Sequence, residues 1–183
     1  MNNELFRGSL VRLTAFDIEK DSKEMEIWSR DSFYLRLLDA AAGGPFNTRM
    51  IVESLEKHDQ NPYLFAIRTL PDDRLIGEIG FGGIDWAARN AWVGIGIGVK
   101  EYWGHGYGTE AMRLMLRFGF AELNLHRVSL DVFDYNARAI RSYQKAGFTI
   151  EGRERKALRR SGERFDIVYM GILRSEWETL PPC

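Results

Sequence analysis

The sequence has little of what several protein classes require. It contains one cysteine, the terminal Cys183, which excludes an internal disulfide and a cysteine-rich metal site. Its three histidines, His58, His105 and His126, are far apart and form no HExxH motif, so we expect no metal ion. No run approaches the roughly 20 apolar residues of a membrane helix, and the N-terminus has no apolar signal-peptide core. These absences predict a cytoplasmic protein with no membrane partner.

The charge is nearly balanced, with 25 basic and 26 acidic residues and a net charge of -1. Such a chain has no overall positive field, so we expect no specific nucleic-acid partner. Its 183 residues, 45% hydrophobic and 28% charged, have the composition of an ordinary globular protein. No linker or repeat divides the chain, which predicts a single domain over residues 1–183. We expect this domain to be either a monomer or a homodimer.

The order of the expected elements indicates an α+β fold. The patterns predict five helices, at residues 17–30, 31–39, 47–57, 109–123 and 136–146. They also predict seven strands, within residues 5–16, 63–70, 75–84, 91–99, 127–133, 148–152 and 165–173. Short polar turns separate the second, third and fourth strands, which is typical of an antiparallel meander. Because helices and strands alternate after the meander, we expect a mixed sheet.

The most informative segment is a glycine-rich turn between a strand and a helix, Glu101-Tyr-Trp-Gly-His-Gly-Tyr-Gly-Thr-Glu110. Gly104, Gly106 and Gly108 allow successive backbone N–H groups to point into one concavity. The helix that follows adds its free N-terminal N–H groups and the positive end of its dipole. The turn therefore predicts a phosphate or diphosphate site, with a plain strand-to-helix turn as the alternative.

Two other phosphate-binding motifs fit this turn poorly. A Walker A loop ends in Gly-Lys-Ser/Thr, whereas this turn ends in Gly108-Thr109-Glu110. A dinucleotide fingerprint needs GxGxxG after the first strand of a parallel βαβ unit, with an acid about 20 residues later. Asp131 has a suitable spacing, but the third glycine is displaced and a meander precedes the turn. The pattern thus disfavours an NAD-dependent oxidoreductase.

Two segments in the right order resemble the GNAT family of N-acetyltransferases. The turn resembles motif A, Arg/Gln-x-x-Gly-x-Gly/Ala, with Trp103 at the Arg/Gln position. Residues 136–148, Asn-Ala-Arg-Ala-Ile-Arg-Ser-Tyr-Gln-Lys-Ala-Gly-Phe, are similar to motif B, Asn-x-x-Ala-x-x-x-Tyr-x-x-x-Gly-Phe. Residues 152–173 resemble the C-terminal hairpin of the RimJ/RimL-like branch, which acetylates ribosomal-protein N-termini, and of spermidine acetyltransferases. The resemblance covers about residues 9–177.

This resemblance implies a GNAT fold and a place for its cosubstrate, acetyl-CoA. The sheet would have about seven strands, mostly antiparallel, with helices on both faces and a V-shaped gap between strands 91–99 and 127–133. Backbone groups of Ile97, Gly98 and Val99 would pair with the pantetheine arm and polarise the thioester carbonyl. The diphosphate would lie on the loop formed by Trp103, Gly104, His105, Gly106, Tyr107, Gly108 and Thr109. Because Trp103 replaces Arg/Gln, we expect the backbone to do most of the diphosphate binding.

The strand before the turn carries alternate glycines, Gly94-Ile-Gly-Ile-Gly98. Alternate glycines clear one face of a strand. The cleared face would accommodate either a ligand that lies close to the backbone or a tightly packed helix.

Two residues of motif B are candidates for the reaction. Asn136 begins a helix and suits the N-cap position, and the resemblance also places it at the cofactor. Tyr143 shares a helix face with Ile140, so core packing alone would explain it. The resemblance makes Tyr143 the acid that protonates the departing thiolate, a role that suits a phenol of pKa about 10.

The general base is less evident, because strand 91–99 contains no carboxylate. Glu78 is the candidate, since an acid between Gly77 and Ile79 in an apolar strand needs a reason. Its alternative is a position that faces solvent. Asp131, Asp134 or a chain of water molecules could accept the proton instead.

The expected function is direct transfer of the acetyl group of acetyl-CoA to a primary amine. We expect no acyl-enzyme, because Cys183 is terminal and no Ser–His pair is evident. Residues 17–31 carry six acids and three bases, whereas hairpin residues 153–166 carry six bases and three acids. A basic rim favours an acidic partner and an acidic rim favours polyamines, and of these we expect a protein or peptide N-terminus as acceptor. A small-molecule acetyltransferase (polyamine, amino acid or antibiotic) and a catalytically silent CoA-binding module are the alternatives.

Overall fold

A computed structural model describes residues 5–58 and 63–181 of the chain; Cys183 lies outside them. Seven strands form one sheet in the order β1-β2-β3-β4-β5-β7-β6. They are β1 (Val11–Thr14), β2 (Leu64–Thr69), β3 (Leu75–Asp85), β4 (Asn90–Ile97), β5 (Arg127–Phe133), β6 (Thr149–Arg160) and β7 (Glu163–Leu173). The β4–β5 pair is parallel and the other pairs are antiparallel. The predicted α+β fold with a mixed, mostly antiparallel sheet is confirmed.

The helices are α1 (Ile18–Ser29), α2 (Ser32–Leu38), α3 (Thr48–His58), α4 (Tyr107–Arg117), α5 (Ala137–Ala146) and α6 (Arg174–Trp177). Helices α1, α2, α3 and α5 begin where the sequence provides side-chain caps. Asp17, Asp31 and Asn136 each accept a hydrogen bond from a backbone N–H in the first turn of α1, α2 and α5. Asn47 does the same for α3, through the N–H of Met50. None of the helices among these residues is long and apolar enough to cross a membrane.

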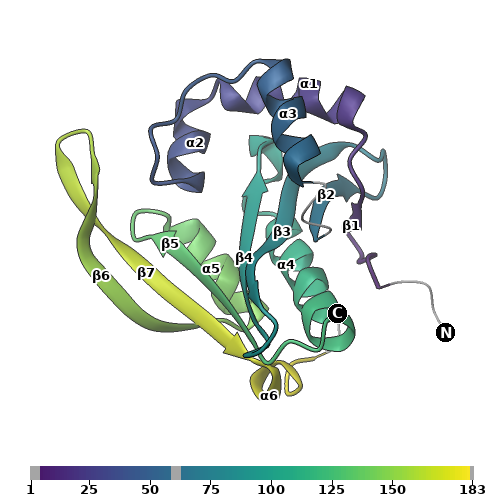
Figure 1. Ribbon diagram of the computed structural model, residues 1–183, viewed down its shortest axis with the longest axis vertical. Coiled ribbons are helices and arrows are strands. Elements are labelled where there is room, and N and C mark those ends of the chain that lie inside the picture. The colour runs from purple at the N-terminus through teal and green to yellow at the C-terminus, as the bar shows by residue number, and fades with distance from the viewer. Residues whose placement is uncertain (1–4, 59–62, 182–183) are drawn as a thin grey trace.

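Helices cover both faces of the sheet, as alternation of side chains along β4 requires. A Cβ at Gly96 would meet Tyr34 of α2, and a Cβ at Gly98 would meet Trp28 of α1. Gly108 of α4 instead faces Ile95 and Ile97, whose side chains are on the opposite face. Figure 1 shows α1, α2 and α3 grouped together, apart from α4 and α5.

The core lies largely between the sheet and α4. Met112, Met115 and Leu116 of α4 and Phe120, just beyond its end, are fully buried. Burial of each such side chain contributes about 1.5–3 kcal/mol. Helix α4 begins two residues earlier than predicted and ends at Arg117, where it continues as a π-helical turn over Phe118–Glu122.

The C-terminal hairpin differs from the sequence-based prediction. We expected short strands at 148–152 and 165–173 with a long charged connection, but β6 extends to Arg160 and β7 starts at Glu163. Only Ser161 and Gly162, both at positive φ, form the turn. A run of charged residues is typical of a loop in sequence. Here the strands continue through backbone pairing, which leaves no pattern in the side chains.

The tip of this hairpin contacts the end of α2. The Arg160 guanidinium donates to the carbonyl oxygens of Asp39 (2.5 Å) and Ala41 (3.0 Å). Arg36 Nη1 donates to Ser161 Oγ at 3.1 Å. These contacts join the tip of the hairpin to the end of α2 and the segment that follows it.

Candidate active site

A gap opens between β4 and β5. The two strands pair only at their start, where residues 90–92 match residues 127–129 in register. Beyond Trp92, β4 pairs with β3 alone, and beyond Ser129, β5 pairs with β7 alone. The sheet is therefore splayed between these strands, as the resemblance implied.

The glycine-rich turn adopts a conformation that glycine allows. Gly104 has a φ of +82° and Gly106, the N-cap of α4, has a φ of +93°. At both positions the backbone is in the left-handed region, which residues with a side chain rarely adopt. A Cβ at Gly104 would have no atom within 4 Å, so the loop surface is open. The turn thus presents bare backbone at the start of α4, a geometry that suits a phosphate group.

A cavity of about 930 Å³ joins this turn to the gap. Six basic side chains line it, namely Arg7, Arg113, Arg117, Arg138, Arg141 and Lys145. The acidic residue in its lining, Glu110, accepts hydrogen bonds from Ser9, Leu10 and Val11. Burial would raise the pKa of Glu110, but these hydrogen bonds outweigh it and hold the pKa below its usual value. Even with Glu110 ionised, the six basic side chains give the cavity an excess of positive charge, which fits the elongated, anionic acetyl-CoA.

The structure brings most of the sequence-predicted residues to this cavity. Its lining includes Ile97, Trp103, Gly104, Gly106, Gly108, Thr109, Asn136 and Tyr143. Other predicted residues lie beside the lining rather than in it. The N–H groups of Gly98 and Val99 donate to the Ile76 carbonyl on β3. His105 is exposed, and the Tyr107 ring packs on Tyr102 with 4.8 Å between centroids.

Tyr143 reaches the cavity from α5, two turns after the Asn136 cap. Burial, together with the charge of Asp131, raises the pKa of Tyr143 to about 12, while Arg138 opposes the shift. Its hydroxyl has no hydrogen-bond partner in the described part of the chain. The phenol therefore keeps its proton at neutral pH and can donate it to a group that enters the gap.

Glu78 lies on β3, opposite Gly96 of β4. It is half-buried, which rules out the alternative of a solvent-facing position, and burial raises its pKa. Its charge also contributes to the raised pKa of Tyr34, after the larger effect of burial. Tyr34 lines the cavity, whereas Glu78 does not. Glu78 is therefore near the site, on the sheet face that Tyr34 covers, but does not line the cavity.

The alternate glycines of β4 serve the packing of helices. A Cβ at Gly98 would be 2.0 Å from Trp28 of α1, and a Cβ at Gly96 would be 2.6 Å from the Tyr34 hydroxyl of α2. At Gly94 nothing lies within 4 Å. Of the two interpretations, tight helix packing is observed at Gly96 and Gly98, and an open face only at Gly94.

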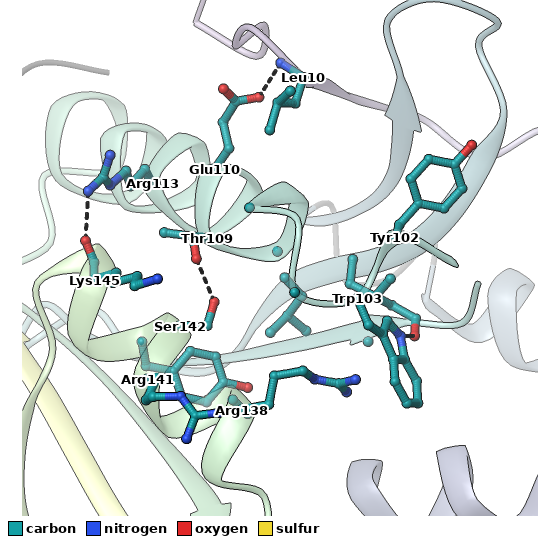
Figure 2. A pocket seen from close by; sticks show the side chains of 18 of the residues that line it. Leu10, Tyr102, Trp103, Thr109, Glu110, Arg113, Arg138, Arg141, Ser142 and Lys145 are labelled. Carbon is teal, nitrogen blue, oxygen red and sulfur yellow. Dashed lines mark hydrogen bonds between the residues drawn. The ribbon is translucent and has the colours of Figure 1, made fainter. Parts of the chain in front are cut away.

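Several residues of the cavity had not been predicted. Figure 2 shows Thr109 bonded to Ser142, with 2.7 Å between the hydroxyl oxygens, and Arg113 bonded to the Lys145 carbonyl at 2.7 Å. These two bonds join α4 to α5. Arg138 lies against the Trp103 ring (Figure 2), with its guanidinium carbon 3.5 Å from the ring centroid. The sequence signal that could have identified some of them is the presence of Arg138, Arg141 and Ser142 at variable positions of motif B.

Known proteins resemble this chain in sequence. Residues 11–149 match the family model described as "Acetyltransferase (GNAT) domain". YjcK of Bacillus subtilis (strain 168), named "Probable N-acetyltransferase", is 39% identical over 127 residues, 69% of this chain and 68% of that protein. YdaF of the same strain, named provisionally as a ribosomal N-acetyltransferase, is 35% identical over 109 residues, 60% and 59% of the two chains. Spermidine N(1)-acetyltransferase of Escherichia coli (strain K12) is 31% identical over 120 residues, 66% and 63%.

Solved structures share the fold. Spermidine N-acetyltransferase from Vibrio cholerae, in complex with CoA and spermine, superposes with a TM-score of 0.81 at 23% identity, covering 94% of this chain and 100% of that one. A GNAT-family acetyltransferase from Bacillus anthracis gives 0.80 at 22% identity, covering 93% and 99%. The match to the family model over residues 11–149, together with the similarity to YjcK, shows that the chain belongs to the GNAT family of acetyl-CoA-dependent N-acetyltransferases.

Proposed function

We propose that this chain, as one acetyltransferase unit over residues 1–183, acetylates the N-terminal amine of a protein or peptide, as RimJ/RimL-like enzymes do. The observation that carries the proposal is the charge of the β6–β7 hairpin beside the gap. Five of its basic side chains are exposed, at Arg153, Arg155, Lys156, Arg159 and Arg164. Such a rim attracts an acidic polypeptide and repels a polycation such as spermidine.

Part of the acidic charge of α1 is used within the fold, whereas Glu19 and Glu24 remain exposed. Asp21 is buried and bonded to Arg68 at 2.6 Å. Glu26 is bonded to Arg30 at 2.6 Å and to Thr48. These carboxylates are taken up within the fold, so the acidic composition of α1 supports a polyamine acceptor less than the sequence suggested.

In the proposed reaction the amine nitrogen bonds to the thioester carbonyl carbon, the C–S bond breaks, and Tyr143 gives its phenolic proton to the thiolate. The raised pKa of Tyr143 keeps this proton in place until the thiolate forms. Asn136 and the loop Trp103–Thr109 hold the cosubstrate, and backbone groups near Ile97 align its pantetheine arm.

The incoming ammonium must lose a proton first, and we propose Glu78 as its acceptor, directly or through water. The raised pKa of Glu78 suits a base, because it lies nearer to neutrality than that of an exposed carboxylate. Asp131 is the alternative. It lies on β5 two residues beyond the last pair with β4, and burial followed by the charge of Asp39 raises its pKa.

A polyamine is the second candidate acceptor, favoured by the similarity to spermidine N(1)-acetyltransferase. An amine panel distinguishes the two. Release of CoA thiol from acetyl-CoA is measured with a thiol-reactive dye against peptides with Ser, Ala or Thr N-termini, spermidine, amino acids and aminoglycosides. We expect turnover with peptides, and most with acidic ones.

A hairpin variant makes the test sharper. Replacing Arg155 and Arg159 by Gln should raise the KM for an acidic peptide and leave the KM for acetyl-CoA unchanged, because both side chains are exposed and lie outside the cavity lining. Turnover with spermidine alone would contradict the peptide proposal. Tight acetyl-CoA binding without turnover on any amine would favour the silent module.

A further inference from the structure

Arg138 is held at the cavity in an unusual way. It is the second residue of α5, and its guanidinium lies over the face of Trp103, 3.5 Å from the ring centroid. The indole Nε1 in turn donates to the Ile97 carbonyl at 2.7 Å, so the ring is fixed to β4. Figure 2 shows Arg138 extending from α5 toward Trp103, across the gap. A cation–π contact of this kind orients the guanidinium while leaving its N–H groups available.

The positive charge of Arg138 has no anionic partner in the described part of the chain. No carboxylate forms an ion pair with it and no acceptor receives its N–H groups there. Burial lowers the pKa of Arg138, with only the Tyr143 oxygen opposing that effect. A half-buried guanidinium with five unfilled donors is unfavourable unless an anion satisfies it.

Two other cations of the cavity, Arg113 and Arg117, are used differently. Arg113 donates to the Lys145 carbonyl and so ties α5 to α4. Arg117 donates to the Leu5 carbonyl at 3.2 Å. These guanidinium groups hold the fold together, whereas the donors of Arg138 face the cavity beside the first residue of the glycine-rich turn.

We propose that Arg138, oriented by the Trp103 ring, binds the diphosphate of acetyl-CoA. The proposal rests on the proposed function. It deepens that function by supplying from α5 the cationic side chain that motif A lacks at position 103. A planar guanidinium can bond two phosphate oxygens at once. The backbone N–H groups of the turn would then hold one side of the diphosphate and Arg138 the other.

Binding of CoA by isothermal titration calorimetry tests this proposal without turnover. For Arg138→Ala we expect a Kd about tenfold or more higher, the usual effect of losing a hydrogen bond to a charged group. Arg138→Lys should recover part of the affinity, because lysine keeps the positive charge but lacks the planar set of N–H donors that bonds two phosphate oxygens at once. Trp103→Leu should also weaken binding, since it removes the surface that orients Arg138. Arg49→Ala, at an exposed position on α3, is the control for the loss of one positive charge.

Ligand variants locate the contact. The Arg138→Ala penalty should persist with 3′-dephospho-CoA, which keeps the diphosphate, and vanish with S-acetylpantetheine, which lacks it. A penalty that disappears with 3′-dephospho-CoA would overturn the proposal, because Arg138 would then bind the 3′-phosphate. An unchanged Kd with a reduced kcat would also overturn it. Failure of the wild-type chain to bind CoA would instead remove the proposed function itself.

Discussion

The two walls of the gap are built in different ways. The β4 wall and its turn present backbone, and their geometry depends on glycines that either adopt positive φ or admit a helix at close range. The α5 wall presents the side chains of Arg138 and Tyr143, whose polar ends the packing of α5 does not require, beside Asn136, whose amide oxygen caps the helix. Substitutions in the β4 wall should therefore change folding and cosubstrate binding together. Substitutions in the α5 wall should change binding or chemistry while the fold persists.

The largest expected effect is at the α5 wall. Tyr143→Phe should lower kcat by about 100-fold or more while CoA binding and the melting temperature stay near those of the wild type, because only the proton donor is lost. With its pKa at about 12, Tyr143 should cause no loss of rate between pH 7 and pH 9.

Thiol release measures kcat, calorimetric titration measures CoA binding, and thermal denaturation measures the melting temperature. Tyr169→Phe, which removes a hydroxyl bonded to Glu154 outside the cavity, is the matched control. Full activity of Tyr143→Phe would show that the thiolate takes its proton from elsewhere.

At the β4 wall, Gly98→Ala should affect folding first. The added Cβ would lie 2.0 Å from Trp28, and overpacking of this kind costs about 1–3 kcal/mol. Thermal denaturation should show a melting temperature lower by several degrees. Gly94→Ala, where nothing lies within 4 Å, should melt like the wild type. A Gly98→Ala protein of normal stability that fails to bind CoA would mean that this glycine serves the ligand rather than α1.

Gly106→Ala tests the turn itself. A Cβ there meets only an ordinary contact with Leu10 at 3.5 Å, so the positive φ is the source of strain. The strain is about 1–2 kcal/mol, which corresponds to a melting temperature lower by about 2–8 °C and should be accompanied by weaker CoA binding. Gly152→Ala, which has open space and no positive φ, is the control. Unaltered CoA affinity would count against the turn as the diphosphate site.

The smallest expected effect on stability is at Glu78, on β3 next to the β4 wall. Burial raises its pKa in the folded chain, so the stability associated with its protonated form is complete at low pH and is lost as pH rises through the folded-state pKa. Glu78→Gln should therefore stabilise the protein at pH 7 and have little effect near pH 4. Melting curves at both pH values measure this.

The same variant also tests the base. If Glu78 accepts the proton of the amine, Glu78→Gln lowers kcat and Asp131→Asn does not. The reverse outcome would transfer the role to Asp131.

Local pattern was enough to predict most elements of the fold. Strand 127–133 matches β5, and the caps Asp17, Asp31 and Asn136 mark helix starts within a residue or two. The limits of α4 and of the β6–β7 hairpin were not predicted. The first depends on a left-handed Gly106 and a π-helical turn, and the second on backbone pairing between strands with polar side chains.

The sequence by itself determined the family, the glycine-rich turn and the positions of Asn136 and Tyr143, because each depends on short spacings within one segment. Only the tertiary structure decided that Gly96 and Gly98 face helices, that Glu110 accepts hydrogen bonds from the N-terminal segment, and that Arg138 lies on Trp103. These contacts join residues 35 to 100 positions apart in the chain. They arise because particular faces of β4, α4 and α5 meet when the core packs. No local sequence pattern specifies which faces meet.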